Sequence, residues 1–202
     1  MKFKIICLLF FLGKLYNQNM LYIIGLGNPG EKYHNTRHNI AWLVLDELFS
    51  DGWTYHKYMN ADIKTGHAGL YIKPQTFMNN SGEVIDFLKK EIDFEPEHVV
   101  IIYDDVDLPF GITRISYDRG DGGHNGVKSI VEHLGSKKCV RIRLGISRLL
   151  VDGRLIKPNV LGNIPPDEQQ NIQNDLAPQV ERILQSLTTD GLEKTMNLYN
   201  TK

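Results

Sequence analysis

The stretch "LYIIGLGNPGEKYHNTRHN", residues 21–39, joins an apolar run to a polar loop rich in glycine and asparagine. Residues 21–25 predict a buried strand, because they are apolar and end at a glycine. The loop continues to Asn35. Apolar residues at helical spacing then predict a helix over residues 36–49, with Thr36 as its N-cap. The sequence therefore begins its fold with a strand, a loop and a helix.

The loop contains a literal G-x-G-x-x-G, residues 25–30, which is the pattern of a dinucleotide-binding turn. That function requires the helix to open within the glycine stretch, so that its N-terminus faces the pyrophosphate. Here the helical pattern begins only near Thr36. An acidic residue should also end the second strand, but Asp51 precedes the next strand. A nicotinamide cofactor is therefore not expected, and no cofactor is predicted.

Strand and helix patterns alternate along the rest of the chain, which predicts an α/β fold: a single-domain sandwich with a mixed, mostly parallel central sheet flanked by helices. Residues 148–165 read as a polar loop. Further strands are expected at 54–58, 62–66, 70–73, 97–105, 112–117 and 140–147. Further helices are expected from Asn80 or Ser81 onward, at 127–134 before a Gly135 C-cap, at 166–187, and after Gly191.

The first twenty residues differ from the rest. Three lysines, no acid and an apolar run from Ile5 to Leu12 imitate a secretory signal, but the run is too short to span a membrane. We favour an upstream start codon for this N-terminal extension, residues 1–19, with residues 20–202 forming the domain. A targeting segment is the alternative. Two cysteines without a C-x-x-C predict a reducing compartment and no cysteine zinc site.

Four polar clusters carry the candidate chemistry: residues 27–39, 73–82, 103–111 and 120–126. The first three follow predicted strands, so they are expected to meet at the carboxyl ends of the sheet. They offer histidines, aspartates and asparagines, but no G-x-S-x-G nucleophile motif. A histidine with a carboxylate suggests a general base that activates water, and asparagine amides suit a carbonyl substrate or an oxyanion.

Metal binding is the competing interpretation of these clusters. His34 and His38 have the four-residue spacing of a metal pair on a helix, but no H-E-x-x-H is present and His34 precedes the helix. Asp104, Asp105 and Asp107 have the oxygen ligands of a Mg²⁺ site. One carboxylate orienting a histidine explains the same residues, so no metal is predicted.

The clusters, in this order, resemble the motifs of bacterial-type peptidyl-tRNA hydrolases. The family pattern runs G-L-G-N-P-G-x-x-Y-x-x-T-R-H-N, K-P-x-T-x-M-N-x-S-G, D-[DE]-x-D-L-P-x-G, G-G-H-N-G-x-x-S-I and R-x-R-x-G-I. These motifs stand here at residues 25–39, 73–82, 104–111, 122–130 and 141–146. The resemblance spans about residues 20–200. It departs from the family at residues 147–150, where Ser-Arg-Leu-Leu replaces the usual sequence before the last helices.

The resemblance implies an enzyme that hydrolyses the ester between a peptide and the 3′-terminal ribose of tRNA, without metal or cofactor. It identifies His38 as the base that activates water, and Asp104 as the residue that holds the His38 imidazole. It places Asn28 and Asn79 on the carbonyl groups of the substrate. Asn125 would orient the water or bind the peptide backbone.

The resemblance also implies contacts with tRNA, from Tyr33 to its 3′ end and from Arg143 to its backbone. The expected partner is peptidyl-tRNA, and the protein is expected to act as a cytoplasmic monomer without a membrane. The alternative is a non-catalytic RNA-binding member of the same fold that acts as an organellar splicing factor. The net charge is −1, but seven basic residues lie near Arg143 with one acid, Asp152. Such a run suits phosphate contacts or a solvated face: Lys137, Lys138, Arg141, Arg143, Arg148, Arg154 and Lys157.

Overall fold

The computed structural model describes residues 20–91 and 93–200 of the chain. The predicted N-terminal extension, residues 1–19, lies outside this part, so its origin stays a prediction.

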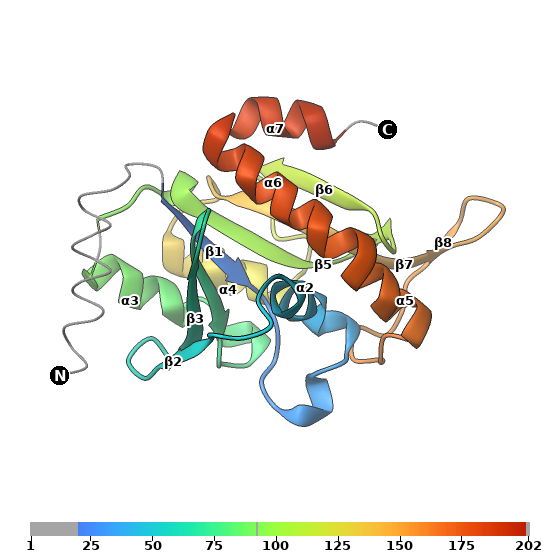
Figure 1. The fold of residues 1–202 in the computed structure, drawn as a ribbon, viewed down its shortest axis with the longest axis horizontal. Helices are drawn as coiled ribbons and strands as arrows, with labels where there is room; N and C mark the ends of the chain where they lie inside the picture. The colour runs from blue at the N-terminus through green and yellow to red at the C-terminus, as the bar shows by residue number, and fades with distance from the viewer. Residues whose placement is uncertain (1–19, 92, 201–202) are drawn as a thin grey trace.

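One eight-stranded sheet organises the described residues (Figure 1). Its order is β2-β3-β4-β1-β5-β7-β6, and β8 pairs with β7. The central strands β4, β1, β5 and β7 are parallel neighbours, whereas β3, β6 and β8 run in the opposite direction. The predicted mixed sheet is therefore confirmed. The strands are β1 Leu21–Gly25, β2 Thr54–His56, β3 Ala61–Gly66, β4 Gly69–Pro74, β5 Val99–Pro109, β6 Thr113–Tyr117, β7 Val140–Leu149 and β8 Leu155–Ile156.

Helices cover both faces of this sheet (Figure 1). Helices α2 and α6 pack on one face, and α3 and α4 pack on the other. Alternate residues of β1 serve the two cores: Ile23 faces α2 and α6, while Ile24 faces α3 and α4. The α-helices are α2 Ile40–Leu48, α3 Glu83–Glu91, α4 Asn125–Leu134, α5 Pro166–Asn171, α6 Ala177–Thr189 and α7 Leu192–Tyr199.

The first predicted helix begins later than its apolar pattern suggests. Residues Arg37–Asn39 form the 3₁₀ turn η2, and the α-helix starts only at Ile40. The prediction that Thr36 caps the helix through its side chain is wrong, because its hydroxyl donates to the Tyr33 carbonyl at 2.8 Å. The short turn sets His38 apart from the regular helix and beside the end of the sheet.

Two other segments also differ from the predictions. Residues 148–165 are not only loop, because Leu155–Ile156 pairs back onto β7 as β8. The predicted helix 166–187 contains a π-helical turn, η5 Ile172–Leu176, where the Ala177 N–H bonds the Ile172 carbonyl. Pro178 follows directly and has no N–H to continue the regular ladder. The proline therefore explains the interruption, which helical periodicity alone does not reveal.

The glycines of the opening motif serve packing between β1 and α2. A Cβ on Gly27 would lie 2.7 Å from atoms of the Trp42 ring, and a Cβ on Gly25 would lie 2.5 Å from Leu45. The Trp42 indole N–H also donates to the Gly25 carbonyl at 2.8 Å. A side chain at Gly27 would therefore overlap the Trp42 ring, whereas one at Gly25 would require the end of the Leu45 side chain to shift.

We expect Gly27→Ala to lower the free energy of unfolding by about 1–3 kcal/mol, because the added methyl overpacks a buried aromatic contact. Urea titrations of the wild type and the variant measure this difference. Gly120→Ala is the matched control, since a Cβ at Gly120 meets nothing within 4 Å. Equal midpoints for Gly27→Ala and the wild type would contradict the packing argument.

Candidate active site

Three polar segments meet at the carboxyl ends of the central strands, as the sequence predicts. Strand β1 lies between β4 and β5, and the three strands run parallel. Asn28 follows β1, Met78 belongs to the 3₁₀ turn η3 (Met78–Asn80) after β4, and Asp104 lies within β5. The Met78 N–H donates to the Asn28 side-chain oxygen at 2.8 Å. The sheet topology therefore joins segments that are far apart in the sequence.

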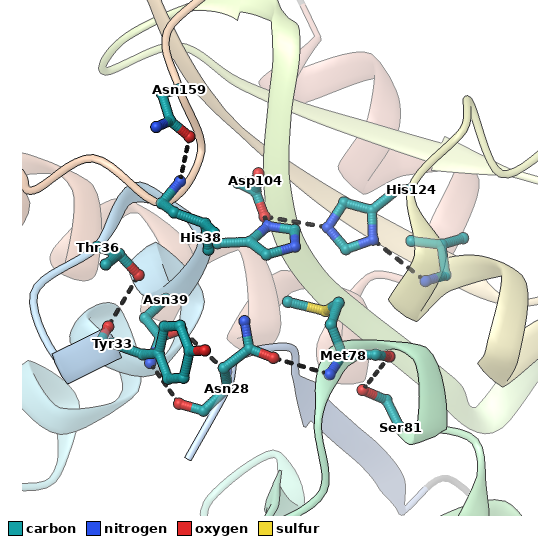
Figure 2. A network of polar contacts seen from close by, with 12 residues as sticks. Asn28, Tyr33, Thr36, His38, Asn39, Met78, Ser81, Asp104, His124 and Asn159 are labelled. Atoms are coloured by element: carbon teal, nitrogen blue, oxygen red, sulfur yellow. Dashed lines mark hydrogen bonds and ion pairs between the residues drawn. The ribbon is translucent and has the colours of Figure 1, made fainter. Parts of the chain in front are cut away.

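Asp104 lies between two histidines (Figure 2). Its Oδ1 is 2.8 Å from His38 Nδ1 and 3.0 Å from His124 Nε2. The carboxylate is 3% exposed, and both imidazoles are largely buried. The contact by which Asp104 was expected to hold the His38 imidazole is therefore present, and His124 also bonds Asp104 from the N-cap of α4.

The hydrogen bonds define which nitrogens carry protons. His124 Nδ1 accepts from the Val127 N–H at 3.3 Å, so its Nε2 carries the hydrogen that it donates to Asp104. His38 Nδ1 likewise donates to the acceptor-only carboxylate. In neutral His38 this leaves Nε2 with a lone pair. The arrangement fits a general base whose tautomer and ring orientation are set by Asp104.

The Asp104 carboxylate stays ionised despite its burial. Burial by itself raises the pKa of Asp104, but the hydrogen bonds from His124 and His38 more than offset it and hold the pKa well below its usual range. The site thus keeps a negative charge beside the His38 ring. That charge favours the imidazolium that His38 becomes when it accepts a proton.

Asn28 is held by a reciprocal pair with Asn39. The Asn28 N–H donates to Asn39 Oδ1, and Asn39 Nδ2 donates to the Asn28 carbonyl, each at 2.9 Å. Since Met78 occupies the Asn28 side-chain oxygen, the remaining polar group of Asn28 is its amide nitrogen. This nitrogen points toward His38 (Figure 2). A substrate oxygen between the two residues would meet a donor and a base.

The turn that carries His38 is fixed by a distant segment of the chain. The His38 N–H donates to the Val160 carbonyl at 2.8 Å, and the Arg37 N–H donates to the Gly162 carbonyl at 3.0 Å. Arg37 also donates to the Ile146 carbonyl and forms an ion pair with Glu168 at 2.7 Å. These contacts bind the turn to β7 and to α5. They hold the histidine in place without a contact to its ring.

The other predicted substrate residues lie around this network rather than within it. Asn79 is exposed, and its amide donates to Asn80 at 2.8 Å. Asn125 is exposed at the start of α4, next to His124. Tyr33 is half-buried and meets the exposed Phe77 edge-on, with ring centroids 6.2 Å apart. The structure therefore brings these residues to the rim of the site.

The seven basic residues that the sequence groups together do not form one patch in the structure. Arg141 is fully buried and donates to the Gly120 carbonyl. Lys137 and Lys138 precede β7, at the end of the strand away from the site, whereas Arg148 lies near its other end. Arg143 is buried and forms an ion pair with Asp105 at 2.7 Å. Two more cations, Arg154 and Lys157, are paired with Asp152 and Asp107.

Sequence reasoning assigned no role to His124 or Asn39. Both belong to the quoted motifs: His124 lies in G-G-H-N-G and Asn39 ends the T-R-H-N motif. The available signal for His124 is its position three residues before the first apolar residue of a helix, where a side chain can cap and still face a strand end. Asn39 carries no comparable signal, because a buried amide bonded to the backbone is recognised only from the fold.

Among the described residues, His38, Asp104 and His124 form the group that could hold a metal ion. The ligand atoms of His38, Asp104 and His124 lie within 4.8 Å of one another. However, the hydrogen bonds from both histidines to Asp104 already explain why these side chains lie together.

Within residues 20–91 and 93–200, no helix has the length and apolar character to cross a membrane.

Comparisons with known proteins agree with these motifs. The family model for peptidyl-tRNA hydrolase matches residues 22–202. Relatives of that name from Bacillus pumilus and Listeria monocytogenes are 39% and 42% identical, and each match covers 91% of this chain and 100% of the relative. A crystal structure of peptidyl-tRNA hydrolase from Acinetobacter baumannii superposes with a TM-score of 0.76 at 29% identity, covering 92% of this chain and 97% of that one.

The relatives are named as hydrolases and match nearly the whole chain, so the alternative of a non-catalytic splicing factor is not favoured. The match covers the central sheet and every segment that contributes to the site. The chain belongs to the peptidyl-tRNA hydrolase family.

Proposed function

We propose that this protein hydrolyses the ester of peptidyl-tRNA with His38 as the general base and Asp104 as the residue that orients it. The observation that carries the proposal is the 2.8 Å bond between His38 Nδ1 and Asp104 Oδ1, which leaves His38 Nε2 as the proton acceptor. Water gives a proton to Nε2 while its oxygen attacks the ester carbonyl. The tetrahedral intermediate then expels the ribose oxygen, which takes the proton from His38.

Asn28 would stabilise the oxyanion of that intermediate. Its side-chain oxygen is bonded to Met78 and its backbone to Asn39, which supports a fixed amide donor rather than a mobile one. A donor that is already oriented requires no rearrangement as charge develops. An ester is a reactive acyl group, so one base and one donor suffice without a covalent intermediate.

The remaining substrate contacts are proposed from the motif match. Asn79 would bind a substrate carbonyl, and Asn125 would orient the water or bind the peptide backbone. Tyr33 would contact the tRNA 3′ end. Arg143 would act on the tRNA backbone, although its guanidinium is already paired with Asp105. The positions of Asn79, Asn125 and Tyr33 on the rim of the network support their assignments, whereas Arg143 is proposed from the motif match alone.

We also propose that the protein works as a cytoplasmic monomer, without a metal and away from membranes. Support for the metal-free reaction is the hydrogen bonding of His38, Asp104 and His124, which forms a base and its orienting group from side chains alone.

The direct test is release of tRNA from N-acetyl-aminoacyl-tRNA by the purified protein. We expect the protein to cleave the ester of N-acetyl-aminoacyl-tRNA with turnover, and to leave aminoacyl-tRNA with a free α-amino group intact. Measuring labelled amino acid released from both substrates under the same conditions checks this. Absence of turnover on the N-acetylated substrate would contradict the proposed function.

Removal of divalent metals is expected to leave kcat unchanged. The base and its carboxylate are bonded to each other, so no step requires an ion at this site. The rate is measured after dialysis against EDTA, with the chelator present, at a monovalent salt concentration that keeps the tRNA folded. Restoration of a lost rate by one added metal would instead indicate a metal site at His38, Asp104 and His124.

A further inference from the structure

A band of amide and aromatic side chains leads away from the site toward the turn between β2 and β3. Met78, bonded to Asn28, is preceded by the exposed Phe77 and followed by Asn79 and Asn80. Gln75 follows β4; its N–H donates to the Asn60 carbonyl, and its carbonyl accepts from the Asn60 side-chain amide. We name the set Phe77, Asn79, Asn80, Asn60, Tyr55 and Tyr58 the amide–aromatic strip.

The outer part of the strip is held rigidly although its rings are exposed. Buried His56 accepts from the Met59 N–H at 3.0 Å, which closes the turn, and the Asn60 carbonyl accepts from the Gln75 N–H at 2.8 Å. The Tyr55 hydroxyl donates to Asn60 Oδ1 at 2.8 Å. Tyr55 and Tyr58 are nevertheless 57% and 71% exposed, and Phe77 is 55% exposed.

Three large exposed rings lie on two segments that the Asn60–Gln75 bonds join, Tyr55 and Tyr58 at the β2–β3 turn and Phe77 just before Met78, and such a group suits a binding surface better than scattered surface residues do. A rigid turn presents its tyrosines at low entropic cost, since few rotamers are lost on binding. The rings lie on the side of the site formed by β2, β3 and β4, away from β6 and β7. The substrate has two arms that diverge from the ester, and this surface can receive one of them.

The chemistry of the strip fits a polypeptide better than RNA. Between Tyr55 and Asn60 the turn carries one cation, Lys57, and the rest of the strip is neutral. A polyanion requires several cations along its path. Amides instead both donate to and accept from a peptide backbone, and tyrosine rings pack on side chains of many kinds.

We propose that the amide–aromatic strip binds the peptide arm of the substrate, with Tyr55 and Tyr58 contacting residues beyond the one that is esterified to tRNA. This inference rests on the proposed function for the identity of the substrate. It predicts that longer peptides are bound more tightly and that the gain depends on the two tyrosines. In this proposal the esterified residue stays at the catalytic network, and only residues further along the peptide contact the two rings.

The test compares N-acetyl-aminoacyl-tRNA with tRNA that carries an N-acetylated pentapeptide. Replacing both tyrosines, Tyr55→Ser with Tyr58→Ser, is expected to lower kcat/KM for the pentapeptidyl substrate by about tenfold, the scale of losing an interface tyrosine contact. The loss should appear in KM rather than kcat. The rate on the one-residue substrate should stay within about twofold, because the catalytic groups are untouched.

Two controls separate ring contact from other effects. Tyr55→Phe with Tyr58→Phe keeps both rings and should retain most of the length preference. Val151→Ser removes a fully exposed apolar side chain from the β7–β8 connection and should change the rate on neither substrate. Equal losses on the short and long substrates, or no loss on either, would overturn the proposal. Weaker competition by deacylated tRNA against the double serine variant would show that the rings contact RNA, and would also overturn it.

Binding without turnover keeps this proposal separate from the proposed function. The same variants are titrated with amide-linked peptidyl-tRNA analogues that resist hydrolysis and carry one or five residues. A wild-type preference for five residues that the double serine variant loses supports the strip even if the ester is not hydrolysed. Equal affinities of the wild type for both analogues would contradict the strip while leaving hydrolysis of the short substrate as an independent result.

Discussion

The variant His38→Ala is expected to hydrolyse peptidyl-tRNA at least about 10²-fold more slowly than the wild type, the scale of losing a positioned general base. The bond from His38 Nδ1 to Asp104 leaves Nε2 with the lone pair that we propose accepts the proton, and alanine offers no replacement. The loss should fall on kcat, because the Asn28 amide and the rim residues that we propose bind substrate remain in place. Single-turnover rates with enzyme in excess measure the chemical step directly.

Other histidines of the chain provide matched controls for His38. His34 lies four residues earlier and is exposed, and His67 is exposed in the turn between β3 and β4. Alanine at either position should leave kcat within about twofold. Equal rates for His38→Ala and the wild type would exclude His38 as the base. Equal loss in His34→Ala would point to a disturbed loop rather than to missing proton transfer.

Much of the fold could be predicted from apolar spacing because its central strands are buried on both faces. The continuous apolar run of β5 and the short run of β1 need no tertiary information to be recognised. The differences occur where local pattern and tertiary contact disagree. Residues Arg37–Asn39 continue an apparent helix, but backbone bonds to Val160 and Gly162 draw them into a separate turn.

The site was predictable in part for a related reason. Parallel strands place their carboxyl ends at one edge, so polar residues after β1 and within β5 were expected to meet, and His38 does contact Asp104. Which carboxylate oxygen of Asp104 accepts a hydrogen bond from which histidine nitrogen depends on side-chain rotamers and on the position of α4. The second histidine on the same oxygen, His124, therefore emerged only from the structure. Burial of Arg141 beneath Gly120 was equally invisible in a count of charges.

The variant Asp104→Asn is expected to lower kcat by roughly 10²- to 10⁴-fold with little change in KM. The Asp104 carboxylate accepts hydrogen bonds from His38 and His124 on one oxygen, and it carries the charge that balances the imidazolium of His38. Asparagine keeps the size but loses the charge. If its amide nitrogen faces His38, it donates to Nδ1 and reverses the tautomer, so that Nε2 is protonated and no longer acts as a base.

The pH dependence of stability tests whether Asp104 is held as an anion by these bonds. Its pKa in the folded protein lies below the ordinary carboxyl value of about 4, so the unfolded state binds the proton more readily. The resulting stabilisation is present above pH about 4 and is lost as the pH falls through the folded-state pKa. The difference in unfolding free energy between the wild type and Asp104→Asn should therefore shrink as the pH falls below about 4.

A second aspartate–histidine pair separates this specific effect from the loss of any ion pair. Asp86 accepts from His133 at 2.8 Å between α3 and α4, and its side chain is exposed. Asp86→Asn should leave kcat unchanged, because no group of that pair reaches the substrate. A kcat for Asp104→Asn within twofold of the wild type would show that His38 is oriented by other contacts, such as the backbone bonds of its turn. A large loss in kcat at a pH where the variant remains folded would locate the effect in proton transfer itself.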